Sequence, residues 1–303
     1  MVDVRPIANE AEEKLSLEAY GETWPHDSFG LPEVQWFKAS LLDHADLLAR
    51  EDGVALGSGF AALFPGLPDR PTVMVTVPPR HRRRGAGTAL YTALSDWARE
   101  RELATLLAVV ADNDPDSLAF AQRRGFVEER REKGVSLDLT RIEPPAVRPP
   151  EGIEIVRWAE RPELARGIYA VSVEASPDVP GYEDEQHESF DDWLAHDMSG
   201  PGDHAEATFV AVAGDDVVGY AKLSIGTARP QRAYHDLTAV RRPWRGRGIA
   251  RALKAAQIAW AKENGFEELR TQNDERNEPI RRLNAEFGYT PAIGRIYLSG
   301  PLA

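Results

Sequence analysis

Two arginine-rich turns in the sequence have the composition of a site that binds a diphosphate. Arg82–Gly87 and Arg245–Ala250 both fit the pattern Arg-x-x-Gly-x-Gly/Ala, and each stands between an apolar strand-like run and an amphipathic helical pattern. The first turn of a helix carries unpaired N–H groups and the positive end of the helix dipole, and small residues let a diphosphate approach them closely. Flanking arginines add charge-assisted hydrogen bonds. The pattern therefore predicts two anion-binding turns.

Neither turn fits the other common phosphate-binding motifs. A Rossmann site needs Gly-x-Gly-x-x-Gly with an acidic residue on the next strand, and a P-loop needs Gly-x-x-x-x-Gly-Lys-Ser/Thr; the sequence has neither at these places. The alternative interpretation of one turn alone is a well-formed helix start in a surface loop. The second occurrence of the motif in the same context disfavours it.

Titratable and amide side chains gather around the second turn and not around the first. Tyr234, His235 and Asp236 lie on the strand that enters the second turn, whereas the first copy has Pro-Thr-Val at 71–73. Asparagines at 273, 277 and 284 follow, where the first copy has Val, Asp and Ala. We expect proton transfer near the second turn. The alternative for His235 and Asp236 is a pair at a sheet edge that takes no part in chemistry. The alternative for the asparagines is that they only cap the last helix and bond locally.

The two turns belong to an internal repeat. Gly85 corresponds to Gly248, and the same offset relates Trp97 to Trp260 and Gly125-Phe126 to Gly288-Tyr289. Residues 140–152 hold four prolines, which is typical of a semi-rigid linker. The repeat predicts an N-terminal domain at 1–141, a linker at 142–152 and a C-terminal domain at 153–303.

Each half shows the same succession of hydrophobic patterns. An opening strand, amphipathic helices, a hairpin and a third strand precede the turn; a helix, a buried strand, a short helix and a closing strand follow it. This order predicts an α/β fold with a mixed sheet covered by helices on both faces. In the first half the expected ranges after the opening strand are 9–22, 32–43, 46–64, 72–77, 84–101, 103–110 and 115–124; in the second they are 159–174, 186–196, 207–225, 233–240, 247–264, 267–271 and 277–286.

Composition excludes several classes of protein. The 303 residues include no cysteine, so disulfides, thiolate metal sites and a cysteine nucleophile are ruled out. The histidines lack metal-ligand spacing, and we expect no metal. A net charge of −13 disfavours a nucleic-acid surface, although Arg80–Arg84 is basic. Without an apolar run of ~20 residues or a signal peptide, the expectation is a cytoplasmic protein with no membrane partner.

The motif Val-x-Pro-x-x-Arg-x-x-Gly-x-Gly/Ala, followed by a short helix that ends in Gly-Phe/Tyr, resembles the pyrophosphate-binding signature of the GNAT superfamily of N-acetyltransferases. Its occurrence twice resembles the tandem arrangement of mycothiol synthase and related actinobacterial two-domain acetyltransferases. The resemblance implies two tandem GNAT domains, acetyl-CoA (coenzyme A) as cofactor, and transfer of an acetyl group to the amine of a small molecule.

The resemblance also implies which residues hold the cofactor. A strand N–H near Thr238 would bind the thioester carbonyl. The second-copy residues implied in binding are Thr238, Val240, Arg241, Arg242, Arg245, Gly246, Arg247, Gly248, Ile249, Ala250 and Asn277. The first-copy residues are Val75, Val77, Arg82, Arg83, Arg84, Gly85, Ala86, Gly87 and Thr88.

Many members of this superfamily carry a general-acid tyrosine four residues before the Gly of Gly-Phe/Tyr. Ala121 and Asn284 occupy those positions here. Given the polar groups of the second copy, we expect the C-terminal domain to be catalytic, with Tyr234, His235, Asp236 and Asn284 as candidates. The alternative is a non-catalytic acyl-CoA-binding or sensor protein with two degenerate GNAT domains.

The acceptor is expected to bind where the copies differ. The Pro/Gly-containing segment 174–185 includes Glu174, Asp178, Tyr182 and Glu185, and its acids could hold a cationic acceptor or simply face solvent. Two similar domains in one chain predict a monomer that acts as a pseudo-dimer, or a homodimer.

Overall fold

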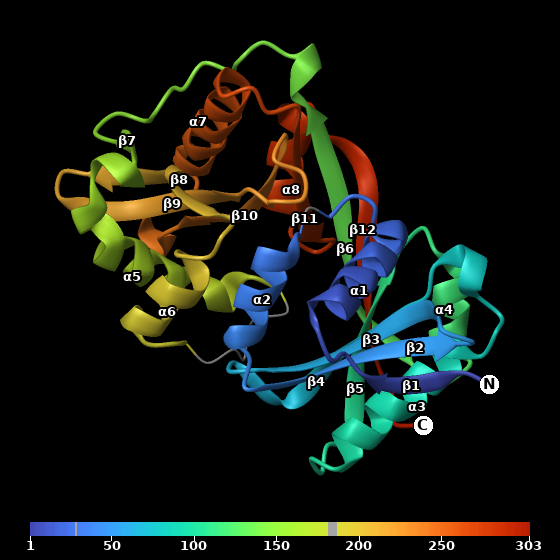
Figure 1. Cartoon of the computed structure of the whole chain (residues 1–303). Coiled ribbons are helices and arrows are strands. Elements are labelled where there is room, and N and C mark those ends of the chain that lie inside the picture. The colour runs from blue at the N-terminus through green and yellow to red at the C-terminus, as the bar shows by residue number, and fades with distance from the viewer. Residues whose placement is uncertain (28, 181–186) are drawn as a thin grey trace. The chain divides into compact units, whose positions relative to one another are not determined.

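The computed structural model describes residues 1–27, 29–180 and 187–303 and divides into two compact units (Figure 1). Unit 1 comprises Met1–Glu132 and Ile293–Ala303, and unit 2 comprises Lys133–Ala292. Two strands, β6 (Val127–Asp138) and β12 (Thr290–Pro301), contribute residues to both units. The division into domains at 1–141 and 153–303 follows the sequence repeat instead and stays a prediction.

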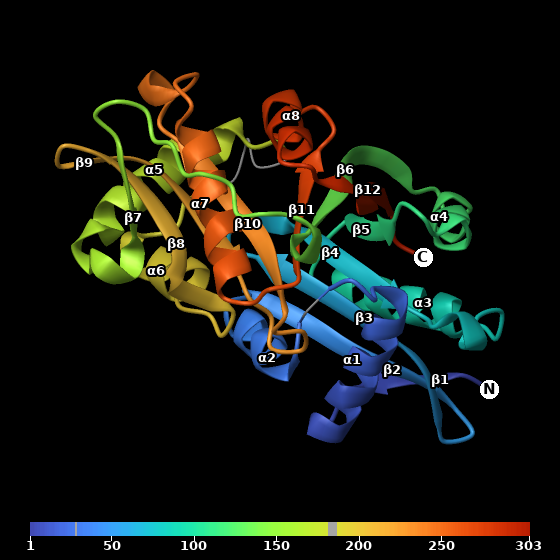
Figure 2. The same ribbon diagram turned by 90° about the horizontal axis from the view of Figure 1, so that it is seen from above.

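Unit 1 contains a mixed sheet in which neighbouring strands follow the order β1, β2, β3, β4, β5, β12 and β6. Helices cover both faces: Figures 1 and 2 show α1 and α3 on opposite sides of this sheet. Gly59 lets α3 approach β3, because a Cβ there would lie 3.1 Å from a methyl group of Leu90. The elements are β1 (Asp3–Pro6), α1 (Glu10–Thr23), α2 (Leu31–Ala39), β2 (Asp43–Glu51), β3 (Val54–Phe64), β4 (Leu67–Thr76), α3 (Ala86–Arg99), β5 (Thr105–Ala111) and α4 (Pro115–Gln122).

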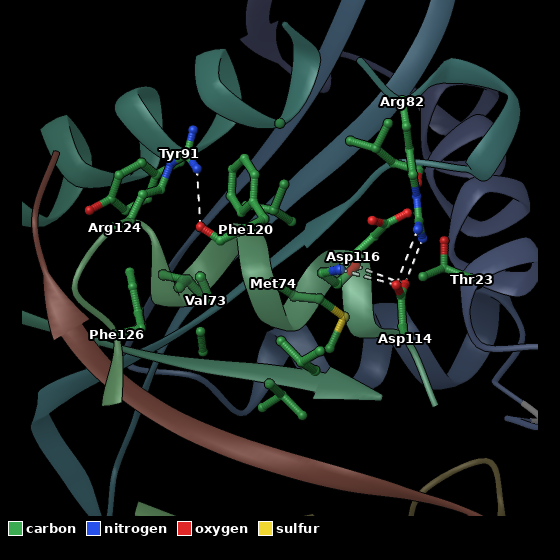
Figure 3. A pocket seen from close by; sticks show the side chains of 18 of the residues that line it. Thr23, Val73, Met74, Arg82, Tyr91, Asp114, Asp116, Phe120, Arg124 and Phe126 are labelled. Atoms are coloured by element: carbon green, nitrogen blue, oxygen red, sulfur yellow. Dashed lines mark hydrogen bonds and ion pairs between the residues drawn. The ribbon is translucent and has the colours of Figure 1, made fainter. Parts of the chain in front are cut away.

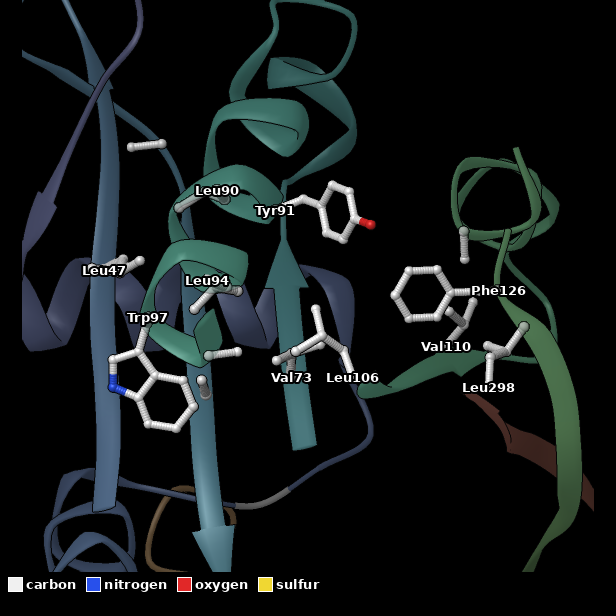
Figure 4. Packing of buried hydrophobic residues seen from close by; sticks show 14 of the residues in the cluster. Leu47, Val73, Leu90, Tyr91, Leu94, Trp97, Leu106, Val110, Phe126 and Leu298 are labelled. Carbon is white, nitrogen blue, oxygen red and sulfur yellow. The ribbon is translucent and has the colours of Figure 1, made fainter. Parts of the chain in front are cut away.

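The C-terminal strand β12 completes the sheet and the core of unit 1. Residues 295–301 pair antiparallel with residues 105–111 of β5. Ile296 and Leu298 alternate with less buried residues and join the hydrophobic cluster around α3 (Figure 4). Gly300 follows the same alternation, and the Phe126 ring occupies the place of its missing side chain, since a Cβ would lie 2.3 Å from that ring. The last strand of the sequence thus belongs to the core of the first unit.

Truncating a side chain of β12 should therefore destabilise unit 1. Leu298 is 0% exposed in the cluster, and Leu298→Ala should lower the free energy of unfolding by about 3 kcal/mol, because it loses buried area and leaves a cavity. Denaturant titration measures the change. Val127→Ala is the control, since Val127 on β6 is an exposed hydrophobic residue. Equal losses in both variants would contradict a core position for β12.

Unit 2 repeats the arrangement, with neighbouring strands in the order β6, β11, β10, β9, β8 and β7. Helix α5 contacts β9 and β10, while α7 contacts β8, β9 and β10; Figure 1 shows them on opposite faces of the unit 2 sheet. The mixed α/β fold with helices on both faces is confirmed. The elements are β7 (Glu154–Arg157), α5 (Ala165–Ala175), α6 (Phe190–Asp197), β8 (Asp203–Ala213), β9 (Asp216–Ser224), β10 (Arg232–Val240), α7 (Ile249–Glu263), β11 (Glu268–Asp274) and α8 (Glu278–Glu286).

Within the described ranges, no helix has both the length and the apolar character that crossing a membrane requires.

Candidate active site

In each unit two parallel strands separate just before the predicted anion-binding turn. β4 pairs with β5 only at Thr72–Leu107 and Val73–Ala108. β10 pairs with β11 only from Arg232 to Tyr234, although both strands continue beyond that point. Strands that stop pairing leave backbone groups and side chains of both edges free to line a shared gap. The strands therefore separate between β4 and β5 in unit 1 and between β10 and β11 in unit 2.

The turns after β4 and β10 have the same construction. Gly85 and Gly248 precede α3 and α7 with φ of 89° and 88°, a left-handed conformation that favours glycine. Arg82 donates from Nε to the carbonyl of Val77 (3.1 Å), and Arg245 donates from Nε to the carbonyl of Val240 (2.9 Å). These arginines hold the turn in shape, and the N–H groups of the first helical turn remain available to an anion.

In unit 1 the gap is a cavity of 330 Å³ (Figure 3). Val75 on β4, Val77 just after it, and Gly85, Gly87 and Thr88 of the turn and α3 line this cavity. The sequence analysis expects cofactor binding at these positions, and that stays a prediction. A Cβ on Gly87 would approach the Phe120 ring to 3.3 Å, so this glycine lets helix α3 and the Phe120 ring of α4 come close together. Ala86, the first residue of α3, is buried in the core instead.

Carboxylates hold the arginines of the unit 1 turn. Arg82 forms two bonds with Asp114 (2.7 and 3.2 Å), and Figure 3 shows this pair at the cavity. Arg84 pairs with Glu51, and Arg83 lies 3.5 Å from Asp116. Hydrogen bonds from Arg82 and Ser117 outweigh desolvation and lower the pKa of Asp114. The turn keeps its positive side chains ordered without a ligand.

In unit 2 the acids of segment 174–180 bind the chain's own arginines. Glu174 accepts from Arg241 (2.9 Å), and Asp178 accepts two bonds from Arg242 (both 2.9 Å) and lies 2.7 Å from Arg245. These hydrogen bonds lower the pKa of Asp178 to about 2. The expectation that Glu174 and Asp178 hold a cationic acceptor is thus replaced by a structural pairing. Tyr182 and Glu185 lie outside the described residues.

The remaining predicted binding residues of unit 2 lie on the same turn. Gly246 (φ 73°) is within the turn, and the Arg247 guanidinium lies 4.9 Å from the centre of the Trp244 ring. Ile249 and Ala250 begin α7, and Thr238 and Val240 lie on β10. Asn277 is the residue before α8, and its side chain makes no capping bond to that helix.

Several apolar or aromatic residues in the cavity wall of unit 1 have polar counterparts in the sequence of unit 2. The substitutions from the first copy to the second are Val73 to Asp236, Tyr91 to Lys254, Val109 to Gln272, Val110 to Asn273, Ala121 to Asn284 and Phe126 to Tyr289.

Two of these polar side chains in unit 2, Gln272 and Asn284, have a buried carbonyl oxygen that accepts no hydrogen bond. Asn284 is 2% exposed and donates from Nδ2 to Oδ1 of Asn273 (2.7 Å). Its own Oδ1 and the Oε1 of Gln272 are buried without a hydrogen-bond partner. A buried carbonyl oxygen without a partner costs ~1–3 kcal/mol. The arrangement fits a ligand that supplies N–H groups between β10 and β11, as the two amides of a pantetheine arm do.

Strand β10 also carries a β-bulge that its counterpart lacks. His235 pairs with Leu223 and Thr238 with Ala221, so Asp236 and Leu237 together oppose Lys222. The corresponding residues 72–75 of β4 pair one to one with β3. A bulge leaves one residue outside the ladder and re-aims side chains, which suits a backbone donor near Thr238.

His235 is enclosed behind the sheet and does not line an accessible site. The residue is 3% exposed, its Nδ1 lies 3.0 Å from Oε1 of Gln257, and its Nε2 bonds the hydroxyl of Tyr289. The Gln257 oxygen can only accept, so Nδ1 carries the proton and Tyr289 donates to Nε2. Desolvation, with the nearby Lys254, lowers the pKa of His235 well below its ordinary value. These contacts suit a structural histidine and not the proton carrier that the sequence predicted.

The buried histidine should make the protein acid-sensitive. Its pKa is lower folded than unfolded, so the unfolded chain binds more protons below pH 6.5 and stability falls as pH decreases. Between pH 7 and pH 5 the free energy of unfolding should decrease by about 2 kcal/mol from this group. Denaturant titrations of wild type and His235→Gln measure the difference in slope. Equal pH dependence in both proteins would refute this origin.

Asp236 takes part in a charged cluster that the sequence analysis missed. Lys222, buried on β9, binds Asp236 (2.8 Å), Asp203 (2.9 Å) and the carbonyl of Asp197. The Asp236 side chain is 44% exposed, and Lys222 outweighs desolvation and lowers its pKa. Desolvation and the neighbouring carboxylates raise the pKa of Asp197 to about 6. Tyr234, the fourth candidate, is half-buried on the same strand. No motif links residues 197, 203 and 222, so only their proximity identifies the cluster.

A comparison with protein-family models matches this chain twice. The model of the Acetyltransferase (GNAT) family matches residues 9–126 and 166–289. A search among curated proteins found no match.

Solved structures with the same fold extend over the whole chain. A GCN5-related N-acetyltransferase from Sphaerobacter thermophilus is 23% identical, with a TM-score of 0.78, and the match covers 99% of this chain and 96% of that one. A tandem GNAT protein from the clavulanic acid biosynthesis pathway is 23% identical, with a TM-score of 0.77, covering 100% and 99%. At this identity the likeness establishes the fold, with two GNAT domains in tandem.

Proposed function

The chain belongs to the Acetyltransferase (GNAT) family, and we propose that it transfers an acetyl group from acetyl-CoA to the amine of a small molecule, with the C-terminal domain as the catalytic one. The observation that carries this proposal is the polar replacement of the cavity wall in unit 2. Cofactor binding alone would not require the accessible Asp236 carboxylate, which has no counterpart among residues 72–75 of unit 1.

The residues of both units fit the cofactor. In unit 1 the cavity and the glycine turn would hold pantetheine and diphosphate, with Val75, Val77 and residues 85–88 in contact. In unit 2 the unpartnered oxygens of Gln272 and Asn284 would accept the pantetheine N–H groups, and the turn before α7 would hold the diphosphate. Bound acetyl-CoA supplies an activated acyl group.

The groups around the β10 bulge suit an amine as acceptor. The Asp236 carboxylate is accessible; its Oδ2 binds Lys222 and Ser224, and its Oδ1 would bind the ammonium form of the acceptor. Asp197, with a pKa of about 6, would take one proton from this ammonium near neutral pH. A backbone N–H of the bulge, near Thr238, would stabilise negative charge on the acyl oxygen. Residues 72–75 of unit 1 carry no carboxylate and no bulge, which supports an auxiliary role in binding acyl-CoA.

Removing the Asp236 charge should separate catalysis from cofactor binding. Asp236→Asn should lower kcat/KM for the amine about 100-fold, because the acceptor loses its carboxylate, while acetyl-CoA affinity stays within a factor of two. Asp203→Asn is the matched control, since it also removes one carboxylate from Lys222 but lies on β8. Amine-dependent thiol release and calorimetry give the two readouts.

Two outcomes would redirect the proposal. Equal losses in Asp236→Asn and Asp203→Asn would mean that the Lys222 cluster acts only on folding. A wild-type protein that binds acetyl-CoA tightly but releases no thiol with any amine of a broad panel would favour the non-catalytic acyl-CoA sensor.

A further inference from the structure

Lys254 on α7 is a buried cation that has no counter-ion in residues 1–27, 29–180 and 187–303. The residue is 1% exposed, and among the described residues no carboxylate lies within ion-pair distance of its Nζ. Burial of an ammonium group is expensive unless a partner compensates it. Desolvation alone accordingly lowers the pKa of Lys254 to about 7, so that the charged and neutral forms coexist near neutral pH.

Among the described residues, the contact that the Lys254 ammonium makes is with an aromatic ring. Its Nζ lies 5.0 Å from the centre of the Tyr289 ring, and the hydroxyl of Tyr289 is already bonded to His235. Gln257, one turn further along α7, uses Oε1 for His235 and leaves Nε2 buried without a partner. In the part of the chain that the structure describes, Gln257 Nε2 is thus a buried donor without a hydrogen-bond partner beside the Lys254 ammonium.

The position of Lys254 in the repeat places it beside the cofactor. Its counterpart in the first copy is Tyr91, which lines the cavity of unit 1 together with Ala121 and Phe126 (Figure 3). The counterparts of those two residues in unit 2 are Asn284 and Tyr289, the second of which is the ring under the Lys254 ammonium. If unit 2 holds the cofactor in the same way as the cavity of unit 1 would, the cofactor passes next to Lys254, Asn284 and Tyr289.

We propose that Lys254 donates the proton that the coenzyme A sulfur takes up as it leaves, a role that Asn284 has no acidic proton to perform. As the amine nitrogen bonds to the acyl carbon, the carbon–sulfur bond breaks and its electron pair goes to sulfur. A proton passes from Lys254 Nζ to sulfur. The acceptor, which reaches this step as the neutral amine after Asp197 has taken one proton, releases a second proton from its nitrogen to solvent, and solvent reprotonates Lys254. The products are the N-acyl amine and the thiol, with charge balanced. This assignment rests on the proposed function of the C-terminal domain.

The first test is binding, which needs no acceptor. In a Gly85→Glu background, in which unit 1 is blocked, calorimetry at pH 8 compares coenzyme A with desulfo-coenzyme A. The thiol shares a proton with Lys254, so the thiol-bearing ligand should bind about tenfold more tightly. Lys254→Met should abolish that preference, and Lys262→Met, which alters the same helix, should keep it.

The second test is the pH profile of kcat. An acid with a pKa of about 7 must be protonated, so kcat should fall above pH 7 in the wild type, whereas Lys254→Met should lose this limb together with about 100-fold in kcat. Lys254→Arg keeps a cation that cannot give up its proton and should lose kcat to the same extent.

The outcomes distinguish failure of unit 2 as the coenzyme site from failure of the role proposed for Lys254. If the Gly85→Glu protein binds neither ligand, unit 2 is not a coenzyme site, and the catalytic assignment fails together with the role of Lys254. If both ligands bind equally well and Lys254→Met retains the descending limb, the role of Lys254 alone is overturned.

Discussion

Replacing Lys254 by methionine should stabilise the protein by about 4 kcal/mol at pH 7 and by less than about 1 kcal/mol at pH 10. The folded pKa, about 7, lies below the unfolded value of 10.5, so the unfolded chain binds more protons between these values. Stability of the wild type therefore rises with pH across that window. Methionine removes the titration and keeps a chain of similar length at a position that is 1% exposed.

Denaturant titrations at the two pH values measure this gain. Lys262→Met is the control, because the Lys262 ammonium donates to the carbonyl of Leu139 (2.7 Å) and its loss should destabilise. A gain in Lys254→Met that is equal at pH 7 and pH 10 would show that packing, and not charge, is responsible. A variant that gains stability and loses turnover would show that the cost of burying this ammonium is retained for function.

Gly248→Glu should remove one acetyl-CoA binding event and reduce turnover more than 100-fold, whereas Gly85→Glu should remove the other binding event and spare turnover. Both glycines have left-handed φ before a helix, and a carboxylate there repels phosphate at the helix start. Calorimetry and thiol release against an amine panel measure the two effects.

Backbone strain alone has its own control in the same chain. Gly152 has φ of 77° with open space around its missing Cβ, and it lies outside both turns. Gly152→Glu should leave binding and turnover intact. If Gly85→Glu abolishes turnover and Gly248→Glu does not, the N-terminal domain is the catalytic one and the roles assigned to Asp236 and Lys254 are wrong.

The sequence determined the family, the repeat and the two turns, because these depend on local patterns. A glycine at a fixed distance after a strand and before an amphipathic helix adopts its conformation largely through near neighbours. The helices after the two turns each begin two residues after the predicted place. The contrast between Val73 and Asp236, or between Ala121 and Asn284, was also readable from the aligned copies.

Burial decided the roles of the polar residues, and burial is set by distant parts of the chain. His235 looked like a titratable group at the reaction, but Gln257 and Tyr289 enclose it. The burial of Lys254 depends on the packing of α7 against the sheet, which the sequence alone does not show. From the sequence, Glu174 and Asp178 could bind a cationic acyl acceptor. In the structure they accept hydrogen bonds from the arginines of the turn after β10.

The sequence likewise did not show which strand β12 would pair with. Each half was expected to close with a strand of its own, yet β12 pairs with β5 and fills the core of unit 1 with Ile296 and Leu298. β5 and β12 carry the same kind of alternating pattern as other strands, and pairing them costs only slightly more chain entropy than a local closure. Local pattern therefore specifies that a strand forms, and only packing, such as the Phe126 ring over Gly300, decides which strand it joins.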